Sequence, residues 1–185
     1  MTTVPELSSL SRRQTERLSL RIPAAGDLPF VTELFSLPAL VAHRPDPRPD
    51  TPEASAARLA KDMAHWEQHG FGRWAVLHQG RLIGFGGVTV SESFAGLNLS
   101  YHLHPSAWGQ GFAGEIVQAA LSAAFGQLGA ARVIGLVRPA NPASAKVLQR
   151  SGFQRDSEVI LHGAQTFLWT LDRIAHGASG VSTPA

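Results

Sequence analysis

The feature that most constrains this chain is a glycine-rich turn, WGQGFAGE, at residues 108–115. It follows a segment that alternates apolar and polar residues (96–104) and precedes an amphipathic run that extends to about residue 128. Alternation is typical of a half-buried strand, and a period near 3.6 is typical of a helix. The sequence therefore predicts a strand, a turn of small residues and a helix, in that order.

A turn of this kind is suited to bind an anion. The first turn of a helix has backbone N–H groups without intrahelical partners, and the helix dipole adds about half a positive charge there. Where side chains are absent, a phosphate oxygen can approach those N–H groups. Gly109, Gly111, Ala113 and Gly114 supply that clearance, so we expect a phosphate or pyrophosphate site. A glycine turn that only links a strand to a helix would have the same pattern.

The same glycines also match the G-x-G-x-x-G spacing of dinucleotide-binding proteins, as Gly109, Gly111 and Gly114. That fingerprint requires an acidic residue about 20 positions later, at the end of a second strand. Residues 129–132 read GAAR and contain no acid. The sequence therefore does not predict a dinucleotide site.

The remaining periodicity predicts one mixed α/β domain over residues 15–173, after a flexible arm (1–14) and before a disordered tail (174–185). A helix would join the strand at 96–104 to the next strand at 131–137, which makes this pair parallel and right-handed. We expect a largely antiparallel twisted sheet of about seven strands with this central parallel pair, flanked by about four helices. The predicted strands are 17–22, 73–78, 81–90, 96–104, 131–137, 153–161 and 165–171, and the predicted helices are 26–36, 52–69, 112–128 and 142–150.

Composition excludes several classes of function. The chain has no cysteine, which excludes a disulfide framework, a thiolate metal site and a cysteine nucleophile, and fits the cytosol. Its arginines are scattered over many segments, so we expect no nucleic-acid partner. No apolar run approaches ~18 residues, and the first residues lack the apolar region of a signal peptide. We therefore expect a cytoplasmic protein without a membrane partner.

Two longer segments resemble the GCN5-related N-acetyltransferase (GNAT) superfamily. They are YHLHPSAWGQGFAGEIVQAAL (101–121) and NPASAKVLQRSGF (141–153). TERLSLRI, HWEQHGFGRWAV and LIGFGGV resemble the same branch, which acetylates ribosomal-protein N-termini and related acceptors (RimJ/RimL type). The resemblance covers roughly residues 15–172. It implies a GNAT fold in which the central parallel pair is splayed, and an N-acyltransferase that depends on acetyl-CoA.

The resemblance also implies where the cofactor binds. In the family, backbone N–H groups of the glycine loop, here residues 108–113, bind the pyrophosphate, and Trp108 replaces the usual Gln or Arg. The pantetheine arm pairs with the strand backbone near Leu103, and Asn141 contacts the pantetheine; Asn141 before Pro142 is also a plain helix cap. No metal is expected. The implied cofactor-binding residues are Leu103, Gly109, Gln110, Gly111, Phe112, Ala113, Gly114, Asn141 and Ser144.

The resemblance makes Ser144 the candidate acid that protonates the departing CoA thiolate. The family often carries a glutamate as general base on the strand here, but the aligned residue is Asn98, which does not titrate near neutrality. His102 on the same strand face and Glu158 on a later strand are the two candidates for this role. A water chain, or no dedicated base, is the third possibility. A backbone N–H near His102 would polarise the thioester carbonyl.

The predicted reaction is direct attack of a primary amine on acetyl-CoA in a ternary complex, because no cysteine is present to carry the acyl group. The acceptor is a protein N-terminus or a small-molecule amine, and the loop at 43–50 should help to shape its entrance. The absence of an acidic cluster disfavours a strongly cationic acceptor such as an aminoglycoside. We expect a monomer or homodimer. The alternative function is a catalytically degenerate CoA-binding sensor or interaction module of the same fold.

Overall fold

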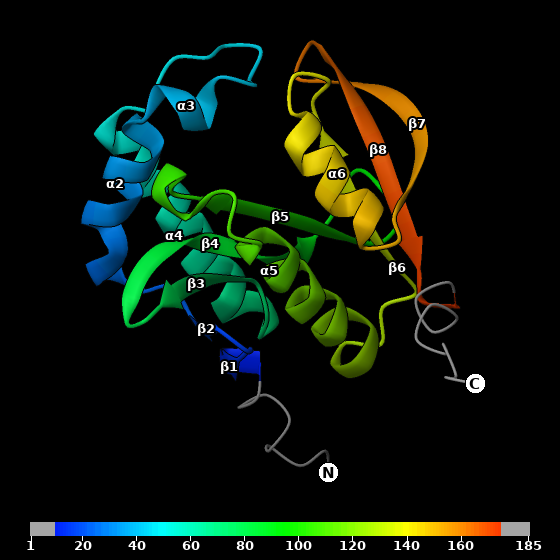
Figure 1. Cartoon of the computed structure of the whole chain (residues 1–185), viewed down its shortest axis with the longest axis horizontal. Helices are drawn as coiled ribbons and strands as arrows, with labels where there is room; N and C mark the ends of the chain where they lie inside the picture. The colour runs from blue at the N-terminus through cyan, green and yellow to red at the C-terminus, as the bar shows by residue number, and fades with distance from the viewer. Residues whose placement is uncertain (1–9, 175–185) are drawn as a thin grey trace.

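A computed structural model describes residues 10–174 of the chain (Figure 1). Its elements form a mixed α/β architecture around one open sheet, as the sequence predicts. The strands are β1 (Arg12–Gln14), β2 (Leu18–Arg21), β3 (Arg73–His78), β4 (Arg81–Val90), β5 (Leu97–Leu103), β6 (Arg132–Val137), β7 (Gln154–Leu161) and β8 (Ala164–Asp172), and the α-helices are α2 (Leu28–Ser36), α3 (Pro38–Val41), α4 (Pro52–His69), α5 (Phe112–Leu121) and α6 (Pro142–Arg150).

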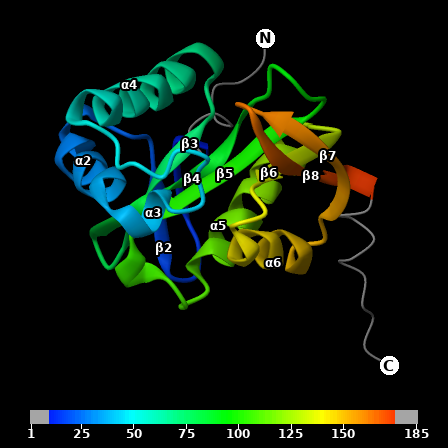
Figure 2. The same ribbon diagram turned by 90° about the horizontal axis from the view of Figure 1, so that it is seen from above.

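The strand order is β1-β2-β3-β4-β5-β6-β8-β7, and every neighbouring pair is antiparallel except β5 and β6. The predicted central parallel pair is therefore confirmed. In Figures 1 and 2, α2 and α4 lie on one face of the sheet, and α5 and α6 lie on the other. In the described part of the chain, no helix is both long and apolar enough to cross a membrane.

The N-terminal region differs from the prediction. The flexible arm expected over residues 1–14 is wrong for residues 10–14, because Arg12–Gln14 forms β1 and pairs with β2. Leu10 is 3% exposed, and its carbonyl accepts a 2.7 Å hydrogen bond from the Trp74 indole. This buried anchor depends on a residue far along the chain, so local composition does not reveal it. Residues 1–9 of the arm and 175–185 of the tail lie outside the described residues.

The helices also differ in detail from the expected set. The short α3 was not predicted, so the described residues contain five α-helices where about four were expected. The helix expected over 112–128 is α-helical only to Leu121, and residues 122–127 continue as π-helix. The predicted cap at Asn141 is present, because its side chain accepts from the N–H of Ser144, and Thr51 likewise caps α4 by accepting from the N–H of Ala54.

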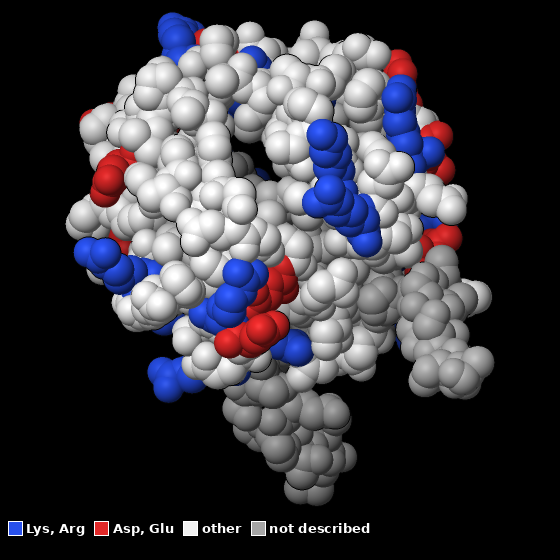
Figure 3. Space-filling view, viewed as in Figure 1, with Lys and Arg blue, Asp and Glu red and all other residues white. Residues whose placement is uncertain are grey.

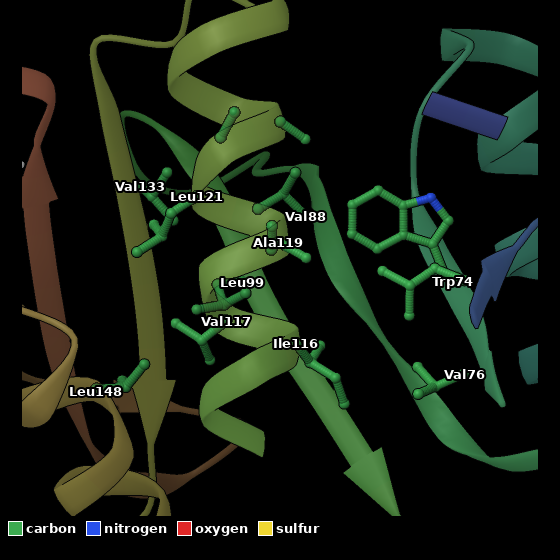
Figure 4. Packing of buried hydrophobic residues seen from close by; sticks show 14 of the residues in the cluster. Trp74, Val76, Val88, Leu99, Ile116, Val117, Ala119, Leu121, Val133 and Leu148 are labelled. Atoms are coloured by element: carbon green, nitrogen blue, oxygen red, sulfur yellow. The ribbon is translucent and has the colours of Figure 1, made fainter. Parts of the chain in front are cut away.

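The position of α5 is set by its apolar side. Ile116, Val117 and Leu121 are fully buried against the sheet, and Trp74 and Val133 lie on either side of the helix (Figure 4). Burial of each such side chain contributes about 1.5–3 kcal/mol, so the helix is held firmly. Only eight residues separate the end of β5 from the start of α5, which keeps the helix N-terminus close to the C-terminal end of β5.

The parallel pair does not stay together along its length. β5 pairs with β6 only from Leu97 to Leu99, opposite Val133 to Gly135. Beyond that point β5 remains paired with β4 as far as Leu103, and β6 remains paired with β8 as far as Val137. We call this divergence the splay. It leaves one edge of each strand without a strand partner in the middle of the sheet, as the family resemblance implies.

The approach of β4 to the splayed part of β5 depends on Gly84. A Cβ at this position would lie 2.2 Å from the carbonyl oxygen of His102 and 2.9 Å from the Cα of Leu103. Both atoms belong to the backbone, so neither can rotate away. Any larger residue would push β5 away from β4 at the point where it lines the splay.

We predict that Gly84→Ala destabilises the protein by about 1–3 kcal/mol, as expected for overpacking against atoms that cannot move. The matched control is Gly126→Ala, where a Cβ meets nothing within 4 Å and helical backbone favours alanine by about 0.5–1 kcal/mol. Urea unfolding measures both free energies. Equal stability of Gly84→Ala and the wild type would show that β4 and β5 do not need this close approach.

Candidate active site

The splay opens into a cleft of about 440 Å³ that reaches the surface. The space-filling view shows it as a deep hollow between the half of the molecule that carries α2 and the half that carries α6 (Figure 3). Residues 43–46 of the proline-rich loop line it, and the entry of the acceptor beside this loop stays a prediction. The other lining residues come mainly from the diverging strands and α6: Leu99, Ser100, Tyr101, His102, Gly135, Leu136, Val137, Arg138, Asn141, Ser144, Leu148 and His162.

The glycine loop, residues 108–114, lies at the N-terminus of α5. Gly109 and Gly111 have φ values of 72° and 80°, which glycine adopts without strain. The first intrahelical hydrogen bond runs from the N–H of Glu115 to the carbonyl of Gly111, so the N–H groups before Glu115 have no helical acceptor. A Cβ at Gly109 or Gly114 would meet nothing within 4 Å. Accessible N–H groups and bare backbone together fit a phosphate.

Two further contacts hold this loop against the strand end. The indole N–H of Trp108 donates to the carbonyl of Leu103 at 2.8 Å, and Gln110 donates to the carbonyl of Ser106 at 2.9 Å. The side chain of Leu103 is buried in the core, whereas Trp108 is 48% exposed. The loop and the end of β5 are therefore one connected unit, which places Leu103 beside the glycine loop.

Arg17 is a loop-positioning residue that the sequence did not reveal. Its guanidinium donates to Glu115 and, at 2.8 Å, to the carbonyl of Gln110, and it stacks over the ring of Phe112 at 4.5 Å. Glu115 also accepts from the hydroxyl of Thr15. Residues almost 100 positions apart meet here, so no local spacing could have indicated the contact. Arg17 ties β2 to the glycine loop.

Ser144 and Tyr101 meet on the face of the sheet that α5 and α6 cover. The Tyr101 hydroxyl donates to the Ser144 oxygen at 3.1 Å, which leaves the Ser144 proton free to donate into the cleft. Asn141 accepts from the N–H of Ser144 and fixes the start of α6. Burial raises the pKa of Tyr101, so its hydroxyl stays protonated near neutrality. The sequence left open whether Tyr101 borders the cofactor or only packs in the core.

His102 faces the opposite side of β5 and contacts Arg73. Burial, followed by the nearby charges of Arg73, Arg58 and Arg44, lowers the pKa of His102 well below its ordinary value of 6.5. The ring is therefore neutral at pH 7. Its Nδ1 lies 3.1 Å from Nη2 of Arg73. Because arginine can only donate, Nδ1 accepts and the ring proton sits on Nε2.

Glu158 is not brought to the cleft. It lies exposed on β7, at the edge of the sheet, where it forms an ion pair with Arg155 and accepts from Gln165 at 2.7 Å. Both ring nitrogens of His65, on α4, are already hydrogen-bonded, so this side chain is not available to bind a metal. Its Nδ1 bonds to the carbonyl of Phe71 and its Nε2 accepts from the N–H of Val90. The part of the chain that the structure describes contains no cluster of three or more metal-ligating side chains.

Comparison with known proteins agrees with this geometry. Residues 17–154 match the family model described as an acetyltransferase (GNAT) domain. The chain belongs to the GNAT acetyltransferase family. The predicted superfamily is thereby confirmed, and this acetyltransferase has the α/β fold expected of it. The RimJ/RimL branch stays a prediction.

Three relatives illustrate the match. The uncharacterized N-acetyltransferase YoaA of Bacillus subtilis is 25% identical over 146 residues, which is 77% of this chain and 82% of YoaA. The structure of an acetyltransferase from Agrobacterium tumefaciens has a TM-score of 0.76 at 25% identity, over 92% of this chain and 96% of that one. AAC(6')-Ib in complex with ribostamycin and coenzyme A has a TM-score of 0.77 at 15% identity, over 91% and 100%, so it shares the fold.

The Glu115 contacts lead to a pH-dependent prediction. Burial alone would raise the pKa of Glu115, but hydrogen bonds from Thr15 and Arg17 hold it below its ordinary value of 4.5. A lowered folded pKa stabilises the protein above pH 4.5, and this contribution is lost as the pH falls through the folded value. We expect Glu115→Gln to lower the Tm at pH 7 and to differ less from the wild type below pH 4.

Thermal unfolding from pH 3 to pH 8 measures this difference. Glu92→Gln is the matched control, because Glu92 is exposed and lies outside the glycine loop and its contacts. Its Tm should follow the wild type at every pH. A Glu115→Gln curve that runs parallel to the wild type throughout would show that the Thr15 and Arg17 contacts do not hold the carboxylate ionised.

Proposed function

We propose that this acetyltransferase transfers the acetyl group of acetyl-CoA to a primary amine by direct attack in a ternary complex. The observation that carries the proposal is the splay of β5 and β6 beside the N-terminus of α5. The glycine loop would bind the pyrophosphate, and the unpaired edge of β5 near Leu103 would pair with the pantetheine arm. The thioester of acetyl-CoA and the acceptor amine would then meet at Ser100 to His102, where the cleft reaches both faces of the sheet.

The chemistry needs few protein groups. The neutral amine nitrogen attacks the thioester carbonyl carbon, the C–S bond breaks, and the CoA thiolate takes the proton of the Ser144 hydroxyl. The new amide nitrogen gives its surplus proton to water. Tyr101 donates to Ser144 and would restore the Ser144 proton, and water would in turn reprotonate Tyr101. Backbone N–H groups on the free edge of β5 would polarise the carbonyl. Most of the acceleration would come from holding the two substrates together, because a thiolate is a good leaving group.

We infer that the amine loses its proton to water, without a dedicated base. In His102 the Nδ1 lone pair accepts from Arg73 and Nε2 already carries a proton, so no ring nitrogen is free to take another. Glu158 lies outside the cleft lining. Asn98 does not titrate near neutrality. The acceptor therefore has to be deprotonated before it attacks, and the rate should rise with pH toward the pKa of the acceptor amine.

The first experiment is thermal unfolding with acetyl-CoA, CoA, ATP and NAD at equal concentration. A ligand at about 100 times its Kd should add ~2.7 kcal/mol, a shift of a few degrees for a chain of this size. We expect a shift with acetyl-CoA and CoA alone. Absence of a shift with either would overturn the cofactor assignment, and a shift with NAD or ATP alone would redirect it to a nucleotide.

Gly114→Val tests whether the glycine loop is the binding site. A Cβ at Gly114 would meet nothing within 4 Å, so the free protein should keep a Tm close to that of the wild type, but the side chain would fill the space beside the first-turn N–H groups. We expect the acetyl-CoA shift to fall by half or more. Gly126→Val, at the other end of the same helical run, is the matched control and should retain the full shift. Equal shifts in both variants would place the cofactor elsewhere.

Another prediction concerns the group that protonates the CoA thiolate. Ser144→Ala and Tyr101→Phe should each lower kcat by roughly 10-fold or more, which is less than the ~10²–10⁴-fold typical of general acid–base catalysis because a thiolate is a good leaving group. Because the two hydroxyls act in series, the double variant should be no slower than the slower single variant. Steady-state release of CoA, measured with a thiol reagent, gives these rates, since the protein has no cysteine of its own. Unchanged turnover in Ser144→Ala would remove Ser144 as the acid.

The alternative function is a CoA-binding module that catalyses no reaction. Asn98 favours it, because the family resemblance places a catalytic glutamate at this position and asparagine cannot act as a base. The two functions differ in one observable. Thiol release above the hydrolytic background with any amine establishes turnover and excludes the alternative. A full thermal shift with CoA and no release over a broad amine panel would favour the binding module.

A further inference from the structure

A second, inner cavity of about 210 Å³ lies beneath α2 and α4, on the face of the sheet opposite α5. It meets the cleft at Ser100, which lines both. Alternation along β5 turns Asn98 and Ser100 toward this side, so the inner cavity begins where the acceptor would stand. The other polar side chains of its walls are Arg58, Lys61, Asp62, Arg73 and Thr89.

Two buried polar atoms in this inner cavity have no hydrogen-bond partner. They are Nε of Arg73 and Oδ1 of Asn98, two of the four such side-chain atoms among residues 10–174. The Arg73 side chain is 12% exposed, and its nearest carboxylate oxygen, on Asp62, lies 3.8 Å from Nε, beyond hydrogen-bond range. Buried donors without acceptors are rare in folded proteins, because the lost hydration is not replaced. This pair therefore points to a ligand with both an acceptor and a donor.

The charges around the two cavities favour an anion. Five cationic side chains line them, Arg44, Arg58, Lys61, Arg73 and Arg138, against two carboxylates, Asp46 and Asp62. Asp46 is bound by Arg48, and a single carboxylate behind the walls, Asp50, is shared by Arg44 and Arg58. The hydrogen bonds of Arg138 go to backbone carbonyls and a threonine hydroxyl. An acceptor that carries several positive charges would be repelled here.

We propose that the inner cavity binds a carboxylate of the acceptor, so that the acceptor is a small amine that also carries a carboxylate, such as an amino acid. A guanidinium presents Nε and a neighbouring Nη as a planar fork that matches the two oxygens of a carboxylate. The unpaired Oδ1 of Asn98 can accept an N–H of the same molecule. The inference rests on the proposed acetyl transfer and adds the class of acceptor to it.

The spacing along β5 suits a compact ligand. Arg73 reaches within 3.1 Å of His102, whose ring lines the cleft, so its guanidinium lies beside the reacting end of the acceptor site. Ser100 stands two residues from both Asn98 and His102, or about 7 Å along a strand. A carboxylate held by Arg73 would therefore leave an amine a few bonds away at the splay.

The test uses matched trios of acceptors: an amino acid, its amide and its decarboxylated amine. Phenylalanine, phenylalaninamide and phenethylamine form one trio, and alanine-, valine- and leucine-based trios extend it; spermidine and 2-aminoethylphosphonate complete the panel. CoA release from acetyl-CoA gives kcat/KM for each, expressed per concentration of neutral amine. We expect the free acids to exceed their amides by about 10-fold or more, the usual effect of a charge-assisted hydrogen bond.

Three variants locate the effect. Asn98→Asp, a nearly isosteric change, puts a carboxylate into the cavity that Arg73 lines, and Arg73→Gln removes the positive charge. Both should bring the acid-to-amide ratio close to one. Arg132→Gln is the matched control, because Arg132 is paired with Asp172 at the far end of the sheet and should leave the ratio unchanged. Thermal unfolding of each free variant shows that it folds, and Asn98→Asp remains informative if Arg73→Gln does not.

The possible results distinguish a failure of the carboxylate site from a failure of the proposed acetyl transfer. If CoA shifts the Tm but amides, simple amines, spermidine or the phosphonate are preferred, the carboxylate site is wrong and the acetyltransferase stands. The carboxylate site is also wrong if the acid-to-amide ratio of kcat/KM stays high in Asn98→Asp. It is wrong as well if the protein turns over no free acid and no free acid raises the Tm of the CoA complex more than its amide does. No Tm shift with acetyl-CoA or CoA would instead overturn the cofactor assignment.

Discussion

The separation of two strands in the middle of the sheet is the constraint on which the rest of the site depends. A parallel pair normally satisfies its backbone groups along its whole length, but β5 and β6 share only three residue pairs before they diverge. The divergence does not break up the sheet, because each strand stays hydrogen-bonded to its other neighbour: β5 pairs with β4 as far as Leu103, and β6 pairs with β8 as far as Val137. The sheet therefore remains rigid while it exposes two backbone edges to a ligand.

The two faces of the splayed strand divide the chemistry. Leu99, Tyr101 and Leu103 belong to the core around α5, and the polar group that they bring to the cleft is the Tyr101 hydroxyl, beside Ser144. The next residues in the alternation, Asn98, Ser100 and His102, face α2 and α4 among the arginines. β5 thus separates a neutral, hydroxyl-lined side suited to a thioester from a cationic side suited to an acceptor that carries a negative charge. A shift of register by one residue would exchange them.

Local signals in the sequence were sufficient for the parts of the site that use backbone. The glycine turn predicted N–H groups at a helix N-terminus, Asn141 before Pro142 predicted a cap, and strand alternation predicted the faces of β5; each depends on a few neighbouring residues. The supporting contacts of Arg17 with Glu115, and of Arg73 with His102, join segments 98 and 29 residues apart. No periodicity or spacing encodes such a meeting, because it arises only when the sheet assembles. The same reason explains why β1 was missed: Leu10 is held by Trp74.

The family resemblance aligns Asn98 with a glutamate, and the surroundings of Asn98 offer a reason for the difference. A glutamate at position 98 would share the inner cavity with Arg73, and the nearby positive charge would lower the pKa of that carboxylate and make it a weaker base. With asparagine, the arginine keeps an unpaired donor and the ligand can supply the missing charge. The exchange gives up a base that the neighbouring cation would have weakened. If the inner cavity binds a carboxylate as proposed, the site selects its acceptor by charge, so asparagine at this position fits a change of substrate as well as a loss of activity.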